Sequence, residues 1–274
     1  MEQVKDKRVD VIFDIVEGPK YKIRSVYFGK TSVYTPEELM PGLSLLGGDS
    51  YSSQKVADDI TMSRKYYGAK GYADAMVRAD LKEVGDNQID IEYVIIEGKP
   101  SKVGNISIQG NVKTKGYVIR RELPLAPEDE FSAVEMEVAQ KRLKNLNYFE
   151  PVAATPAPST RPGYRDINIE VREKQTGSLS FGFGFSTIES VVFFANVTQS
   201  NFDLYDWSSF TGGGQRFSVD ARLGDKTQNA SISWVEPWFL GQKLAFGTDI
   251  FYARYTYYSD FYTQQNFGAA VSLR

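Results

Sequence analysis

The sequence predicts two tandem α+β domains, followed by the first strands of an antiparallel transmembrane β-barrel that is incomplete, with about six strands. Three observations lead to this fold class. A sequence pattern recurs along the first part of the chain, the amino-acid composition changes abruptly near residue 176, and the last third alternates large apolar residues with small or polar ones. In each α+β domain the expected order of elements is β-α-α-β-β.

A repeated segment organises the first part of the chain. Residues 9–11 match residues 89–91 at an offset of 80 residues, and a weaker copy of the same strand lies at residues 166–174. A period this long indicates an array of small domains rather than a solenoid of short repeats. The predicted divisions are the last strand of a preceding unit at 1–19, one domain at 20–99, a final domain at 100–175 and the barrel strands at 176–274.

Turn and capping residues indicate the elements of the first domain. Thr35 before Pro36 predicts a helix start, because Pro fits the first helical position. Gly85-Asp86-Asn87 predicts a hairpin turn between two strands. The expected elements are a strand at 22–28, a short helix from Pro36, a helix from Ser52 or Ser53 to about Tyr67, and strands at 73–81 and 88–96.

The second domain is expected to repeat this order. The expected strands lie at 103–108, about 152–155 and 167–172, and the expected helices lie at 115–122 and 132–146. Pro156, Pro158, Pro162 and Gly163 predict a loop between the last two strands, because Pro interrupts a β-ladder.

The remaining residues follow different rules of composition. Residues 177–274 hold 22 of the 37 aromatic residues but only 14 of the 67 charged ones. In the segment 177–186, Leu179, Phe181 and Phe183 alternate with Ser or Gly, and five later segments alternate similarly. Segments of roughly ten residues are long enough to cross a bilayer as tilted strands. Closed single-chain barrels begin at about eight strands, so we expect these residues to belong to a longer protein.

The strands of a soluble β-sandwich or soluble barrel would also show alternating apolar and polar residues. Three features favour the membrane: aromatic residues such as Trp207 and Phe210 cluster at strand ends, short and long turns alternate, and Asp220, Arg222 and Asp249 fall on the polar face. Aromatic girdles and a wet interior are typical of outer-membrane barrels.

The composition excludes most catalytic chemistry. Cys and His are absent and the net charge is −3, which removes thiolate nucleophiles, Ser-His-Asp triads and a general attraction to nucleic acid. Gly29-Lys30-Thr31 lacks the first Gly of a P-loop, whose position is taken by Arg24. Asp58-Asp59 and Glu128-Asp129-Glu130 fit solvated surface better than a cation site, and Gly212–Gly214 fits a turn. We expect no enzyme activity, no cofactor and no metal.

Four segments carry a family resemblance. They are NISIQGN with VIRREL (105–111 and 118–123), RLKNLNYFEPV (142–152), DINIEVREKQTGSLSFGFGFST (166–187) and NASISWVEPWFLG (229–241). In this order they resemble POTRA domains and the start of the barrel in the outer-membrane insertase family typified by BamA. The proline-rich loop at 155–162 departs from the family pattern.

The resemblance implies a central subunit that folds β-barrel proteins and inserts them into the bacterial outer membrane, with its POTRA domains in the periplasm. The physical means is strand addition, in which an incoming strand satisfies the free N–H and C=O groups of a sheet edge. The implied partners are unfolded outer-membrane protein clients, accessory lipoproteins and outer-membrane lipid, and no nucleic acid.

The resemblance also implies three sets of site residues. The first barrel strand would pair with the client through Gly177, Ser178, Leu179, Ser180, Phe181, Gly182, Phe183, Gly184 and Phe185. The POTRA edge strand would contribute Ala73, Ala75, Val77, Ala79 and Leu81, with about 152–155 as its counterpart in the second domain. An accessory subunit would dock at Arg120, Arg121 and Glu122. Without the resemblance, these residues would be interpreted as charged side chains on the exposed face of a helix. Gly182 and Gly184 fit a weakly paired gate strand, or they make room in a crowded lumen.

Other functions stay open at this point. The superfamily includes two-partner secretion transporters, which carry two POTRA domains, and the assembly relative TamA, which carries three. A third unit at 1–19 favours the insertase over the secretion transporter. If the protein ended at Arg274, a periplasmic polypeptide-binding module would be the better interpretation.

Overall fold

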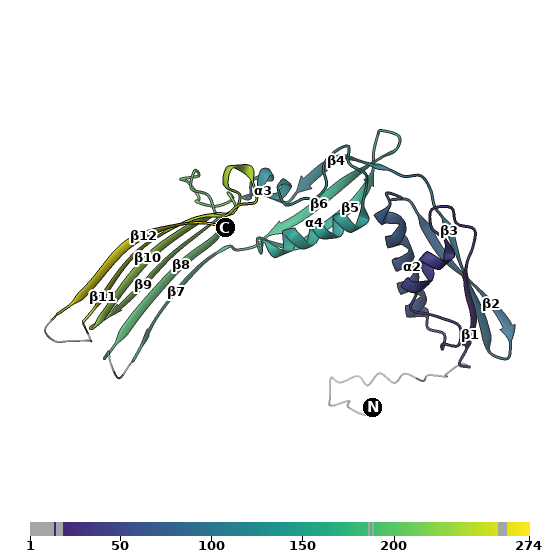
Figure 1. The fold of residues 1–274 in the computed structure, drawn as a ribbon, viewed down its shortest axis with the longest axis horizontal. Coiled ribbons are helices and arrows are strands. Elements are labelled where there is room, and N and C mark those ends of the chain that lie inside the picture. The colour runs from purple at the N-terminus through teal and green to yellow at the C-terminus, as the bar shows by residue number, and fades with distance from the viewer. Residues whose placement is uncertain (1–13, 15–18, 186, 188, 257–261) are drawn as a thin grey trace, which may run out of the picture. The chain divides into compact units, whose positions relative to one another are not determined.

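The computed structural model describes residues 14, 19–185, 187, 189–256 and 262–274 (Figure 1). The chain divides into two compact units, residues 1–68 with 74–99, and residues 69–73 with 100–274. The strand expected at 1–19 lies almost wholly outside the described residues. Among the described residues, no helix is long and apolar enough to span a membrane.

The first domain, in the first unit, has the predicted order of elements. They are β1 (Lys22–Phe28), α1 (Pro36–Leu39), the 3-10 turn η1 (Met40–Gly42), α2 (Ser53–Ala69), β2 (Met76–Gly85) and β3 (Gln88–Ile96). The sheet has the order β1-β3-β2, with β1 parallel and β2 antiparallel to β3. Asp86 and Asn87 both have positive φ, as the tight hairpin between β2 and β3 requires.

One acidic residue that we expected on the surface, Asp59, lies in the core of the first domain. Asp59 is fully buried on α2 and accepts hydrogen bonds from the Tyr93 hydroxyl at 2.9 Å and the Ser44 amide at 2.5 Å. Burial, and then the bond to Asp59, raises the pKa of Tyr93. Asp58 is exposed, so only Asp59 of the two belongs to the core, and no group of three or more metal-binding residues occurs among the described residues.

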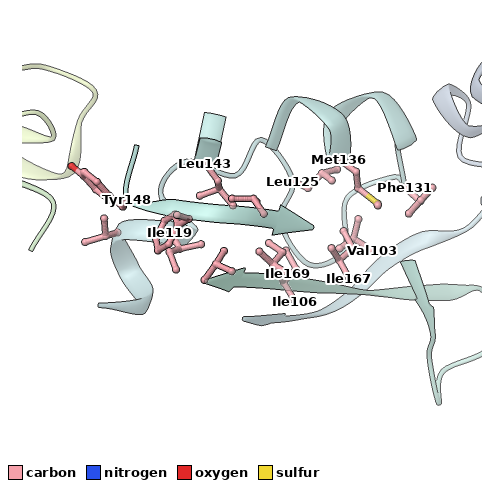
Figure 2. Close-up of a cluster of buried hydrophobic side chains, with 14 residues drawn as sticks. Val103, Ile106, Ile119, Leu125, Phe131, Met136, Leu143, Tyr148, Ile167 and Ile169 are labelled. Carbon is pink, nitrogen blue, oxygen red and sulfur yellow. The ribbon is translucent and has the colours of Figure 1, made fainter. Parts of the chain in front are cut away.

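The second domain repeats the arrangement. It contains β4 (Lys102–Gln109), α3 (Gly116–Arg120), α4 (Ala133–Asn145), β5 (Phe149–Pro158) and β6 (Tyr164–Glu173), in a sheet of order β4-β6-β5. Figure 2 shows Met136 and Leu143 of α4 directed at the sheet, where they meet residues such as Ile167 and Ile169. Ser132 caps α4 by accepting the amide of Glu135.

Two predicted strand boundaries are wrong. β2 begins at Met76, so Ala73 and Ala75 precede the strand, and Ala75 is a buried residue. β5 continues to Pro158, so Pro156 and Pro158 belong to a strand rather than to the predicted loop. Proline is tolerated there because β5 is an edge strand, where every second residue needs no partner for its N–H.

The last part of the chain forms the predicted six-stranded antiparallel sheet. Its strands are β7 (Gly177–Gly184), β8 (Val192–Phe202), β9 (Gln215–Gly224), β10 (Thr227–Glu236), β11 (Phe246–Tyr255) and β12 (Gln264–Leu273). They lie side by side in chain order (Figure 1). The short 3-10 turn η2 (Phe239–Gly241) lies between β10 and β11.

Cross-strand pairing gives this sheet one apolar face and one polar face. Val219 pairs with Val197 on one side and Ile232 on the other, and the neighbouring Asp220 pairs with Asn196 and Ser231. Because side chains alternate along a strand, the first set shares one face and the second set shares the other. The apolar face therefore suits lipid and the polar face suits a hydrated interior.

Candidate strand-pairing site

β7 forms one edge of the six-stranded sheet. Within the described residues it pairs with β8 alone, from Gly177 opposite Gln199 to Gly184 opposite Val192. The N–H and C=O groups of every second residue of β7 point to its other side, where the described residues place no strand. Eight of the nine predicted pairing residues form this strand, and Phe185 follows it directly.

The two faces of β7 differ as the sequence predicted. Leu179, Phe181 and Phe183 are all at least 65% exposed on the apolar face. On the polar face, the Ser178 hydroxyl lies 2.6 Å from that of Thr198. An incoming strand with the same alternation would continue both faces.

The two glycines of β7 have different surroundings. A Cβ on Gly182 would lie 2.5 Å from Cζ of Phe194, so the glycine leaves room for the Phe194 ring. A Cβ on Gly184 would have no neighbour within 4 Å. Crowding thus accounts for Gly182 and not for Gly184, and the gate role of both stays a prediction.

The second domain is joined to the six-stranded sheet next to β7 through buried polar contacts. Asn201, at the end of β8, donates to the Thr114 hydroxyl at 2.9 Å and accepts from the Gly214 amide at 2.9 Å. Lys115 forms an ion pair of 2.5 Å with Asp203, whose side chain is 1% exposed. Hydrogen bonding to Asp203 raises the pKa of Lys115. We call these contacts, together with those of Arg121 and Glu122 below, the joint.

Arg121 and Glu122 both belong to the joint. Arg121 donates to the Gly214 carbonyl at 3.3 Å, lies 3.7 Å from the Glu236 carboxylate and stands over the Trp238 ring at 5.7 Å. Glu122 is 8% exposed and accepts the Trp238 indole N–H at 2.8 Å. These side chains are occupied within the chain, so we do not assign them to an accessory-subunit surface. Arg120 is exposed, and its part in docking stays a prediction.

The three glycines Gly212, Gly213 and Gly214 form more than a turn. Gly212 and Gly214 have positive φ, and a Cβ on Gly212 would lie 2.1 Å from the Lys113 carbonyl oxygen. The Lys115 amide donates to the Gly212 carbonyl at 3.0 Å. The glycines therefore allow the loop after β8 to approach the backbone of the second domain closely.

Sequence reasoning missed a pair of equivalent carboxylates. Glu97, after β3, accepts the amides of Ser32 and Val33, and Glu173, at the end of β6, accepts those of Lys113 and Thr114. Burial alone would raise both pKa values, but the donated hydrogen bonds outweigh it and lower the pKa of Glu97 to about 2. Their matching places in the repeat were the available signal. Glu173 thereby holds the same loop that contacts Asn201.

The edge strands of the two α+β domains are β2 and β5, as expected, with β1 and β4 at the opposite edges. Of the five predicted edge residues, Val77, Ala79 and Leu81 lie in β2, opposite Ile95, Tyr93 and Ile91 of β3. Ala73 and Ala75 do not, as noted above. The counterpart at 152–155 lies within β5.

Comparisons with known proteins agree with this architecture. The POTRA model, described as a surface antigen variable number repeat, matches residues 21–98 and 101–174, and the Omp85 superfamily domain model matches residues 209–274. The outer membrane protein assembly factor BamA of Nitratidesulfovibrio vulgaris is 26% identical over 256 residues, which are 92% of this chain and 31% of that protein. BamA of Neisseria meningitidis serogroup B is 27% identical over 239 residues, 86% of this chain and 29% of that protein.

A solved structure shares the fold. The crystal structure of BamA from Haemophilus ducreyi lacking POTRA domains 1–3 has a TM-score of 0.74 at 22% identity, over 92% of this chain and 47% of that one. The chain spans about three tenths of the length of the curated relatives it matches.

Proposed function

The chain belongs to the Omp85 superfamily and carries two POTRA repeats, and on that premise we propose that it is part of a subunit that folds β-barrel proteins and inserts them into the outer membrane. Its place is the bacterial outer membrane, with the POTRA domains in the periplasm. The clients are unfolded outer-membrane proteins. No covalent step is required, because each client strand gains its hydrogen bonds by pairing.

The alternation of β7, with Leu179, Phe181 and Phe183 on its exposed apolar face and Ser178 on its polar face, is the observation that carries this proposal. A strand edge facing lipid cannot find water, so each unpaired backbone group there costs several kcal/mol. A client strand that enters the membrane has the same need. Pairing with β7 satisfies the client strand, which meets a template with the alternation it must itself adopt.

The joint supports this proposal by placing a rigid periplasmic domain beside the start of β7. The Lys174 amide donates to the Tyr148 carbonyl at 2.9 Å, and the Ser200 amide donates to the Thr176 carbonyl at 3.0 Å. The residues that lead into β7 are thus fixed to the second domain on one side and to β8 on the other. A client segment held by a POTRA domain would reach the membrane next to β7.

Site-specific photocrosslinking tests the proposal. A photoreactive residue is placed at Ser180 in β7, or at Ser231 in the middle of the sheet, and an unfolded eight-stranded outer-membrane protein is supplied as the client. Both positions lie on the polar face, but Ser231 is flanked by paired strands on both sides, so it is the matched control. We expect crosslinks from position 180 during insertion and none from position 231. Insertion without a crosslink at 180, or equal crosslinks at both positions, would refute it.

The same experiment separates the related activities. A secretion pore would pass its substrate through the interior, where position 231 also faces. Crosslinks from position 231 that outnumber those from 180 would therefore favour transport over assembly.

A further inference from the structure

The two POTRA domains have four sheet edges, and the chain itself covers the start of two of them. In the first domain, β1 is flanked by a loop, because the Ile23 amide donates to Asp49 at 2.8 Å and the Gly48 amide donates to Ile23 at 2.7 Å. In the second domain, the Val103 amide donates to Asp129 at 2.8 Å. These backbone bonds occupy the outer sides of β1 and β4 at their starts, so an added strand cannot pair along the whole length of either edge.

The outer side of β5 is occupied by a side chain near its start. The Val152 carbonyl accepts the side-chain amide of Gln140 on α4 at 2.7 Å. In an antiparallel strand the N–H and C=O of one residue point to the same side. The N–H and C=O of Val152 therefore point away from β6, and so do those of every second residue after it.

Two prolines close the rest of that side. Pairing between β5 and β6 runs without a register shift from Val152 to Pro158, so Pro156 and Pro158 share the outward side with Val152. Neither proline can donate a hydrogen bond. Along the outward side from Val152 to Pro158, only Val152 and Ala154 keep an N–H, and an added strand would meet missing donors at the other positions.

β2 is different in each of these respects. It pairs with β3 at nine positions, with a register shift between Glu83 and Gly85, and contains no proline. Within the part of the chain that the structure describes, no backbone hydrogen bond from another segment reaches it. Val77, Ala79 and Leu81 pair with buried residues of β3, whereas Arg78 and Asp80 lie on the opposite face and form an ion pair of 3.2 Å.

We infer that the second of these two POTRA domains is closed to client strands along β5 by Gln140 and two prolines, so that strand addition to this pair of domains falls to β2 of the first. The inference rests on the proposed function and assigns its periplasmic step to one edge. The partner is an extended segment with apolar and polar residues in alternation. Its apolar side chains continue the row of Val77, Ala79 and Leu81, and its polar ones lie beside Arg78 and Asp80.

Crosslinking to a peptide tests the inference on the full chain. The probe is a synthetic peptide with the sequence of β9, QRFSVDARLG, which has the required alternation. A photoreactive residue is placed at Asp80 in β2 or at Thr155 in β5, two positions whose partners in the sheet are Glu92 and Asn168. We expect the peptide to crosslink at position 80 and to give only background at position 155.

A gain-of-function variant tests the cause. Pro156→Thr with Pro158→Thr restores two outward N–H groups, and we expect crosslinking at position 155 to rise about tenfold, the ratio that about 1.4 kcal/mol of added hydrogen bonding gives. Pro162→Thr lies outside β5 and is the matched control, expected to leave position 155 at background. Circular dichroism and thermal melting confirm that each variant is folded.

Each outcome decides one claim. Equal crosslinking at positions 80 and 155 in the unmodified chain, or a variant that stays at background at 155 while 80 reacts, overturns the inference and leaves the proposed function standing. Client insertion with no peptide crosslink at 80 overturns the use of the β2 edge. Loss of client contact at both β2 and β7 overturns the proposed function itself.

Discussion

Replacing Asn201 by Ala should loosen the joint between the second POTRA domain and the six-stranded sheet. Asn201 is 3% exposed and bridges Thr114 of the domain to Gly214 of the loop after β8. The buried Gly214 amide would be left without a hydrogen-bond acceptor, which costs about 1–3 kcal/mol. The lost bond to Thr114 adds about 0.5–1.5 kcal/mol. Thr114 retains its bonds to Glu173, so the total is about 3 kcal/mol.

Hydrogen–deuterium exchange measures this effect at the joint itself. About 3 kcal/mol corresponds to roughly a hundredfold faster exchange wherever local opening controls the rate. The increase is expected in peptides that contain Gly214 and in those that contain Lys115, whose amide donates to Gly212. Exchange in the central strands should stay unchanged, because their ladders do not involve Asn201.

Asn196→Ala is the matched control. Asn196 also donates a side-chain hydrogen bond, to Asp220 at 2.5 Å, but it lies exposed on the polar face of the sheet and away from the joint. It should not alter exchange at Gly214. Unchanged protection in the Asn201 variant, or an equal loss in both variants, would refute the assignment of Asn201 as a bridge.

Three further predictions concern folding. Gly212→Ala should weaken the joint by about 1–3 kcal/mol through backbone strain and a clash with Lys113, whereas Gly241→Ala, also at positive φ but in open space, should leave exchange at the joint unchanged. Glu97 has a pKa of about 2 in the folded protein against an ordinary value of 4.5, so its contribution to stability is complete above pH 4.5 and is lost as the pH falls toward 2. Thermal melting should show this decline, and Glu97→Gln should flatten it. Leu143→Ala empties a fully buried core site and should cost about 2–5 kcal/mol in urea unfolding; a cost below about 1 kcal/mol would contradict the assigned core.

Local pattern was sufficient for most of the fold. The alternation along residues 177–274 placed all six strands of the sheet, and the repeat of 80 residues predicted the order of elements in both domains. Both signals depend only on near neighbours in the chain, because the period of a strand and the start of a helix are set within a few residues. The main local error was at Pro156 and Pro158. A proline predicts a loop unless it is known that its nitrogen points away from the neighbouring strand.

The site was less predictable, because its contacts join distant parts of the chain. Arg121 and Glu122 carry charge, which made them candidates for an outside partner, yet the bond from Trp238 to Glu122 spans 116 residues within the chain. Composition predicted only a turn at the three glycines. The structure shows that a side chain at Gly212 would clash with the carbonyl of Lys113. No spacing rule connects these residues.

By itself, the sequence determined the family, the repeat, the faces of the strands and the absence of His and Cys chemistry, because each follows from residue identity and short-range periodicity. Only the tertiary structure decided which strand edges are open. An edge is open or closed according to what lies across it, so the same β-strand pattern describes β2, whose outer side no other described segment covers, and β5, which Gln140 and two outward prolines close. That difference, rather than the pattern, determines where a client strand can pair.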